Sequence, residues 1–144
     1  AVFADGVSDL SISDVEVREV GVAGIKITNS SRVTVTGVTT PQLGDCKNGI
    51  IIDGCDDVTL SDLTIGTDWE DDIRILNSTN VRLSDSRFRD ARNGIYIKGS
   101  PGTTVRNCEV REVWRESVHI EDSPNCSLTG GTITTPEKGV FLKD

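Results

Sequence analysis

Three side chains that commonly bind carboxylates or transfer protons recur at nearly equal spacing in the middle of this chain. Arg74, Tyr96 and His119 are separated by 22 and 23 residues, and His119 is the only histidine. An arginine neutralises a carboxylate, whereas tyrosine and histidine accept or donate protons. Lys98 is a second candidate for holding a carboxylate. Arg74, Tyr96 and His119 are therefore our candidate catalytic residues.

Both tryptophans lie near these residues in the sequence. Trp69 and Trp114 are 45 residues apart, about two of the same intervals. Flat aromatic faces stack on sugar rings, and two strand spacings of about 5 Å each match about two sugar residues. We predict that Trp69, Trp114, Lys98, Arg92 and Arg115 bind a sugar substrate. The alternative is that each indole covers the turn beside it.

Acidic residues surround Trp69 and form one short run, made of Asp68, Glu70, Asp71 and Asp72. Several carboxylate oxygens close together can hold a hard cation such as calcium. Two carboxyl groups at a suitable separation can also act as acid and base on a glycosidic bond. The alternative to both hypotheses is a solvated acidic turn.

The spacing of these side chains follows a repeat that covers the whole chain. Its clearest copy is NGIYIKGS at 93–100, and the six copies open at residues 24, 49, 72, 94, 117 and 139. Apolar and polar residues alternate in each copy, which is typical of a strand. A second phrase, as in 81–88, shows two further alternating stretches separated by a bend. The repeat therefore predicts three short strands per coil of 22–25 residues.

Strands this short form sheets only by pairing with the same strand of the next coil, about 4.8 Å away. We therefore predict one all-β domain over residues 1–144, a parallel β-helix of about six coils. Equivalent residues then form columns along the solenoid. One outward column holds Phe3, Lys26, Ile51, Arg74, Tyr96, His119 and Phe141. One turn column with positive φ holds Asn29, Gly54, Asn77, Gly99 and Asp122, followed by the small residues Ser30, Cys55, Ser78, Ser100 and Ser123.

This pattern resembles the right-handed parallel β-helix family, the superfamily of pectate lyases and polygalacturonases. Segment 48–100 is similar to the polygalacturonases, whose four catalytic motifs occupy successive coils. The matching positions here hold Asn48-Gly49, Glu70-Asp71, Asn93-Gly94 and His119-Ile120-Glu121, so only the acidic pair is kept. An asparagine cannot exchange a proton as a carboxyl group does, so that hydrolase activity is not expected. The uronate lyases and epimerases of the same fold imply instead Tyr, His, Arg or Lys near a carboxylate-bearing sugar, often with calcium.

Composition excludes several classes of function. The net charge is -8 and no Lys- or Arg-rich run occurs, so we do not expect nucleic-acid binding. No apolar run approaches the roughly 20 residues that would span a bilayer, so we do not expect membrane insertion. A hydrophobic fraction of 35% with 4% aromatic residues suits a solenoid, whose coils each bury a small set of side chains.

Two functions fit these observations. The first is an extracellular or cell-surface module that binds or processes an acidic polysaccharide, with calcium as a candidate cofactor. As an enzyme it would be a lyase, an epimerase or a glycoside hydrolase. The second is a structural rod or filament segment without catalytic activity. The repeat continues to both ends without an amphipathic cap, so we expect a longer solenoid or end-to-end self-association.

Overall fold

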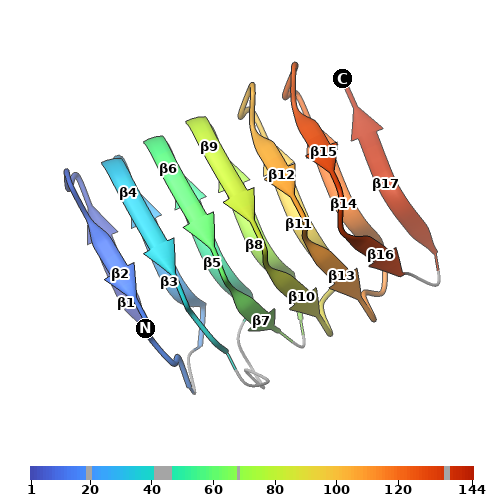
Figure 1. Ribbon diagram of the computed structural model, residues 1–144, viewed down its shortest axis with the longest axis horizontal. Helices are drawn as coiled ribbons and strands as arrows, with labels where there is room; N and C mark the ends of the chain where they lie inside the picture. Colours follow the sequence, from blue (N-terminus) through green and yellow to red (C-terminus); the bar gives the residue numbers. More distant parts are fainter. Residues whose placement is uncertain (19–20, 41–46, 68, 135–136) are drawn as a thin grey trace.

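The computed structural model, which describes residues 1–18, 21–40, 47–67, 69–134 and 137–144, confirms the predicted all-β solenoid (Figure 1). Its coils lie side by side from the N-terminal to the C-terminal end, about six in number. Within the described residues the strands form three parallel sheets, and a full coil contributes one strand to each. The prediction of three strands per coil is therefore confirmed.

The seven-stranded sheet carries most of the residues predicted to be functional. In spatial order it contains β1 (Val2–Asp5), β3 (Ala23–Thr28), β5 (Asn48–Asp53), β8 (Asp71–Leu76), β11 (Asn93–Lys98), β14 (Glu116–Glu121) and β17 (Lys138–Lys143). The six-stranded sheet contains β2 (Ser11–Ser13), β4 (Ser31–Thr36), β6 (Asp56–Ser61), β9 (Thr79–Ser84), β12 (Thr104–Arg106) and β15 (Ser127–Thr129). The four-stranded sheet contains β7 (Thr64–Gly66), β10 (Arg87–Arg89), β13 (Glu109–Arg111) and β16 (Thr132–Thr134).

The strand register confirms the predicted outward column. Tyr96 pairs with Arg74 on one side and with His119 on the other, and His119 pairs with Phe141. One step of the repeat is one full coil, so residues 22 or 23 positions apart in the chain lie one strand spacing apart. The period alone therefore places the candidate catalytic side chains in a row.

The core is a continuous stack of aliphatic side chains between the three sheets. In the seven-stranded sheet Ile73, Ile95 and Val118 pair in one inward column, and all three are fully buried. Such columns put like side chains in contact between coils, so each coil buries its apolar residues mainly against its two neighbours.

Turn residues form columns as regular as those of the core. The predicted positive-φ column is confirmed, with φ between 47° and 63° at Asn29, Gly54, Asn77, Gly99 and Asp122. The serine ladder that follows it explains why small polar side chains are buried there. The hydroxyl of Ser78 accepts a hydrogen bond from the Cys55 backbone N–H of the preceding coil at 3.0 Å and donates one to the Leu76 carbonyl at 2.6 Å.

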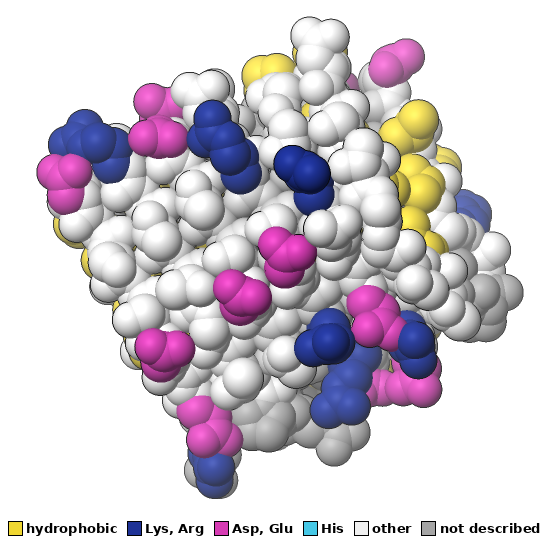
Figure 2. Space-filling model, viewed as in Figure 1, with side chains coloured by type: hydrophobic (Ala, Val, Ile, Leu, Met, Phe, Trp, Pro, Cys, Tyr) yellow, Lys and Arg dark blue, Asp and Glu magenta, His cyan; other side chains and the backbone are white. Residues whose placement is uncertain are grey.

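The face shown in Figure 2 is mainly backbone and uncharged side chains that are not hydrophobic, with interspersed charges of both signs, and no histidine is visible on it. Hydrophobic side chains gather at the C-terminal end of the solenoid. Among the described residues no helix is long and apolar enough to cross a membrane.

Candidate functional site

A shallow cleft lies on the outer surface of the seven-stranded sheet, over β8, β11 and β14. Its volume is about 330 Å³. The strands supply some of its lining and the residues just before each strand supply the rest: Glu70, Asp71, Arg74, Arg92, Asn93, Tyr96, Arg115 and His119. The cleft therefore contains all three candidate catalytic residues and two of the predicted substrate-binding arginines.

An aromatic stack runs along the outward column and forms one wall of the cleft. The rings of Tyr96 and His119 have centroids 4.7 Å apart, and His119 lies 4.9 Å from the ring of Phe141. The Arg74 guanidinium covers the free face of Tyr96 at 5.3 Å from its centroid. Stacking on both faces fixes the plane of each ring, so Tyr96 and His119 are held in defined orientations.

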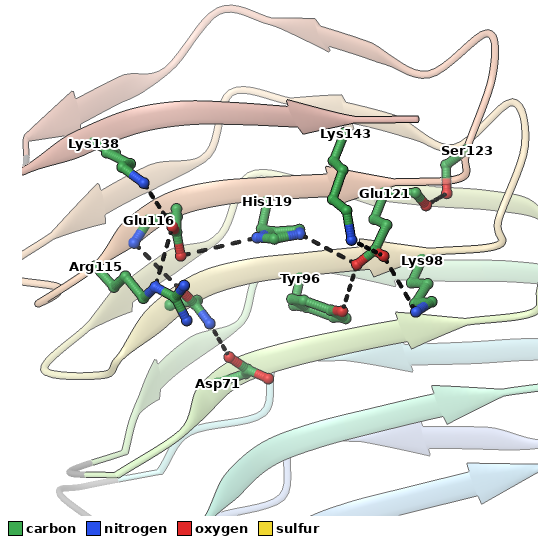
Figure 3. Close-up of polar contacts among 11 residues, drawn as sticks. Asp71, Tyr96, Lys98, Arg115, Glu116, His119, Glu121, Ser123, Lys138 and Lys143 are labelled. Carbon is green, nitrogen blue, oxygen red and sulfur yellow. Dashed lines mark hydrogen bonds and ion pairs between the residues drawn. The ribbon is translucent and has the colours of Figure 1, made fainter.

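Glu121 is the carboxylate that joins these rings to two lysines (Figure 3). Its Oε2 accepts a hydrogen bond from the Tyr96 hydroxyl at 3.2 Å and lies 3.5 Å from Nε2 of His119. Its Oε1 lies 2.8 Å from Nζ of Lys143 and 3.3 Å from Nζ of Lys98. The Lys143 contact above all lowers the pKa of Glu121 to about 2, so this side chain is a carboxylate at neutral pH.

The second ring nitrogen of His119 also faces a carboxylate. Its Nδ1 lies 3.9 Å from Oε2 of Glu116, whose side chain is only 1% exposed. Two cations surround the other oxygen of this glutamate, with Arg115 at 3.2 Å and Lys138 at 3.6 Å. A buried carboxylate needs such partners, because an unpaired charge in the interior is costly. The two ring nitrogens of His119 therefore face different carboxylates, Glu121 at 3.5 Å and Glu116 at 3.9 Å.

Tyr96 is the better placed proton donor of the two rings. Burial, followed by the neighbouring Glu121, raises the pKa of its hydroxyl, so the group stays protonated at neutral pH. Among the described residues the hydroxyl makes one hydrogen bond, to the carboxylate of Glu121, which stays charged at neutral pH. Tyr96 is thus suited to donate a proton rather than to accept one.

Asp71 is the acidic group that lines the opposite part of the cleft. Its Oδ1 accepts a hydrogen bond from Nδ2 of Asn93 at 2.6 Å, and its Oδ2 lies 3.3 Å from Nε of Arg74. Burial raises the pKa of Asp71, and the Asn93 hydrogen bond and the Arg74 charge offset only part of that effect. Asp71 is therefore a candidate proton acceptor whose pKa is raised from its ordinary value by burial.

Asp72 points in the opposite direction from Asp71, into the solenoid. Its Oδ1 accepts hydrogen bonds from both the backbone N–H and the hydroxyl of Thr67, and the residue is fully buried. Neighbouring coils carry glycine at this inward position, where a Cβ on Gly94 would lie 2.3 Å from the side chain of Val110. At the start of each coil, side chains therefore do not alternate between the outer surface and the interior as they do in a regular strand.

The predicted metal ligands are consequently divided between two sides of the sheet. Glu70 and Asp71 face the cleft, Asp72 faces the interior, and Asp68 lies outside the described residues. Among the residues that the structure describes, no three His, Cys, Asp or Glu side chains are grouped to hold a metal ion. The described carboxylates therefore do not form a calcium site on their own, and calcium binding stays a prediction.

Comparison with known proteins gives the family of the chain. A family model described as the right-handed beta helix region matches residues 1–144. The chain belongs to the right-handed β-helix family. A crystal structure of the periplasmic alginate epimerase AlgG is similar to it in fold, with a TM-score of 0.52 and 16% sequence identity. The similarity covers 97% of this chain and 46% of that one, and no curated protein matches in sequence.

The other predicted substrate-binding residues of this β-helix chain lie around the cleft rather than in it. Trp69 and Trp114 are 56% and 54% exposed and directly precede the lining residues Glu70 and Arg115. Both indoles are therefore accessible to a ligand. Lys98 is not part of the lining, because its ammonium group is turned toward Glu121.

Three polar residues that contact the predicted site residues of this β-helix, Glu121, Glu116 and Asn93, were not predicted as site residues. Glu116 was not predicted from the sequence, and Asn93 and Glu121 were considered only as positions that match the polygalacturonase motifs. The sequence contains a pattern that could have identified two of them. Asn93 and Glu116 stand two residues before the first core residue of their coils, in one column with Asp71. Reading that column across coils would have predicted a polar row beside the aromatic stack.

Proposed function

We propose that this chain binds an acidic polysaccharide, one built from uronate sugars, in the cleft over β8, β11 and β14. The observation that carries this proposal is the convergence of three guanidinium groups on one cleft. Arg74, Arg92 and Arg115 line it together with Tyr96 and His119, against two carboxylates, in a chain whose net charge is -8. A local excess of positive charge in an acidic protein favours an anionic ligand.

Arg92 is the arginine best placed to bind the sugar carboxylate. It is exposed, and among the described residues no carboxylate lies within 4.0 Å of its guanidinium. Arg74 and Arg115 already form ion pairs with Asp71 and Glu116, respectively. They therefore add positive electrostatic potential to the cleft more than they add free hydrogen-bond donors. A guanidinium holds a carboxylate through two parallel hydrogen bonds, which would orient the sugar ring over Tyr96.

Chemistry on the uronate is a natural extension of this binding. The chain is similar in fold to the periplasmic alginate epimerase AlgG. The resemblance to the uronate lyases and epimerases of this fold implies a carboxylate-bearing sugar as substrate. Removal of the proton next to the carboxylate leaves a negative charge on the carboxylate oxygens, which Arg92 and Arg74 would stabilise. Asp71 or His119 would accept that proton, and Tyr96 would donate one. Return of a proton from the other face gives the epimer, whereas loss of the linked sugar oxygen gives an unsaturated product.

Trp69 and Trp114 would extend the binding surface beyond the cleft. Each is more than half exposed, and each lies next to a cleft residue on coils two steps apart. In this arrangement a glycan runs along the solenoid axis, across the strands, with its sugars stacked on the two indoles.

Binding is tested by titrating oligouronates and neutral oligosaccharides of equal length against the chain. We expect the oligouronate alone to bind, and Arg92→Ala to weaken it about tenfold, which corresponds to about 1.4 kcal/mol. Arg82→Ala is the matched control, since Arg82 is an exposed arginine on β9 of the six-stranded sheet. Equal binding of the neutral sugar, or equal effects of the two substitutions, would refute the proposal.

Catalysis is tested separately with the same oligouronates. Epimerisation in heavy water introduces deuterium at the carbon next to the carboxylate, and elimination produces an unsaturated sugar that absorbs ultraviolet light. Tyr96→Phe should abolish either signal while leaving binding intact. Activity that survives His119→Ala would remove His119 from the proton transfer. Binding without either signal would leave a sugar-binding module and exclude the enzymatic extension.

A structural rod is a second candidate function, and the regular stacking of β1, β3, β5, β8, β11, β14 and β17 in one parallel sheet favours it.

A further inference from the structure

We propose that the outer surface of the six-stranded sheet holds a second ligand site, which binds a sulfate ester group of a sulfated glycan between Arg82 and Arg106. The site is a groove of about 570 Å³ over β9 and β12, larger than the cleft of about 330 Å³ on the seven-stranded sheet. In Figure 1 the six-stranded sheet lies in front of the seven-stranded one, so the two sites are on different walls of the solenoid.

The groove lies where two columns of hydroxyl side chains are interrupted by cations. The outward positions of the six-stranded sheet form two columns, in which every member except Arg82 and Arg106 is serine or threonine. The first column holds Ser11, Thr34, Thr59, Arg82, Thr104 and Ser127, and the second holds Ser13, Thr36, Ser61, Ser84, Arg106 and Thr129. The two arginines are on neighbouring coils, and both line the groove.

Four side chains at the centre of the groove form a rectangle with the arginines at opposite corners. Arg82 pairs in register with Thr104, and Ser84 pairs with Arg106. Neighbouring parallel strands are about 4.8 Å apart, and positions two residues apart along a strand are about 6.6 Å apart. Each guanidinium therefore has one hydroxyl beside it along its own strand and another on the neighbouring strand, so donors surround the centre of the groove on four sides.

These donors are available to a ligand. Within the part of the chain that the structure describes, no hydrogen bond or ion pair engages the side chains of Ser84, Thr104 and Arg106. The side chain of Arg82 is 61% exposed and forms an ion pair with Asp57 at 3.5 Å, a residue that does not line the groove. A guanidinium has five N–H donors, so Arg82 keeps donors for a ligand.

The charge of the lining indicates which anion fits. The lining holds two arginines and one carboxylate, Asp85, whose Oδ1 accepts a hydrogen bond from Nδ2 of Asn107 at 3.2 Å. A local excess of one positive charge, in a chain with a net charge of -8, is matched by a ligand group with a single negative charge. A sulfate ester carries one negative charge at neutral pH, whereas a phosphate monoester carries about -1.5 to -2.

The shape of the anion separates this groove from the cleft on the seven-stranded sheet. A carboxylate has two oxygens in one plane, and a single guanidinium holds it through two parallel hydrogen bonds. A sulfate ester has three terminal oxygens that point in different directions, so it can use both guanidiniums and both hydroxyls of the rectangle. We therefore expect a sulfated sugar to bind in the groove and a uronate to bind in the cleft. Arg82→Ala remains a valid control for uronate binding, and the inference does not rest on the proposed function.

The test is a titration of the ¹⁵N-labelled chain with a dextran sulfate oligosaccharide and with unsulfated dextran of the same length, followed by amide chemical shifts. Both titrations are made at one ionic strength, because salt screens contacts between exposed charges. We expect the sulfated sugar alone to bind, with the largest shifts in β9 and β12. Arg106→Ala should weaken binding about tenfold, which corresponds to about 1.4 kcal/mol. Thr104→Val keeps the side-chain shape without the hydroxyl and should weaken binding less.

Arg32→Ala is the matched control. Arg32 lies on β4 of the same sheet, is exposed and pairs with Asp9, but it does not line the groove. The substitution removes the same charge from the same sheet, so its effect on binding should stay within about twofold. The amide spectrum of each variant shows directly whether it is folded.

Equal effects of Arg106→Ala and Arg32→Ala would overturn the proposal, because they would indicate a general attraction between the sulfated sugar and positive charge. Shifts centred on the cleft, equal binding of unsulfated dextran, or tighter binding of inorganic phosphate than of inorganic sulfate would overturn it as well. Arg92→Ala should leave binding of the sulfated sugar unchanged, and Arg106→Ala should leave oligouronate binding unchanged. The failure of one proposal is therefore distinguishable from the failure of the other.

Discussion

Replacement of Ser78 by alanine tests the serine ladder, which links the coils independently of the apolar core. The Ser78 side chain is fully buried, and its hydroxyl accepts the Cys55 N–H at 3.0 Å. Without the hydroxyl, the Cys55 N–H has no hydrogen-bond acceptor and is buried away from water, which costs about 1–3 kcal/mol. The Leu76 carbonyl also loses a donor, but it keeps the Gly54 N–H at 3.0 Å, so its loss costs about 1 kcal/mol or less. We expect Ser78→Ala to lower the free energy of unfolding by about 2–3 kcal/mol.

The measurement is urea unfolding followed by circular dichroism, with the free energy of unfolding extrapolated to water. Ser123→Ala is the matched control. Its hydroxyl makes the same two contacts, with the Ser100 N–H and the Glu121 carbonyl, but it belongs to the last coil and is half-exposed, so water can replace it. The control should cost less than about 1 kcal/mol. Equal effects at the two positions, or no effect at Ser78, would show that these hydrogen bonds do not stabilise the stack.

Three other substitutions test the core, the buried acid and the sugar surface. Ile95→Asp puts a carboxylate between Ile73 and Val118, and we expect a loss of at least several kcal/mol, seen as unfolding in circular dichroism; a folded variant would contradict the inward assignment of the column. Burial raises the pKa of Asp72 far above its ordinary value, so the folded state retains the proton and stability falls as pH rises through that pKa. Asp72→Asn should flatten this dependence, and its unfolding midpoint relative to wild type should rise from pH 5 to pH 8; an unchanged difference would argue against a protonated Asp72. Truncation of Trp69 to alanine should weaken oligouronate binding without a change in the unfolding midpoint, whereas the reverse result would assign the indole to covering its turn.

Much of the fold could be predicted because the repeat fixes neighbours. Once the step between copies is known, the residues above and below Tyr96 follow by counting, and the register places Arg74 and His119 there. The same counting located the turn residues with positive φ, since Asn, Asp and Gly recur there for one steric reason. No stretch of the sequence shows a helical period that would compete with this strand pattern.

The direction of side chains at the start of each coil could not be predicted in this way. Asp71 and Asp72 are adjacent residues of the same type, yet one lines the cleft and the other is buried against Thr67. The sequence pattern does not distinguish them, because strict alternation holds within a strand and fails where the chain bends into it. The neighbouring coils carry Gly49 and Gly94 at this position, where an added Cβ would lie 2.3 Å from the side chains of Ile65 and Val110.

The sequence by itself determined which residues are neighbours, because parallel pairing between identical coils turns a fixed period into a fixed register. The tertiary structure alone decided which atoms meet. Glu121 was one acid among many in the chain, and its carboxylate becomes the common partner of Tyr96, His119, Lys98 and Lys143 only because three coils bring those side chains within reach of it. Contacts of this kind depend on side-chain length and rotamer, which the period does not encode.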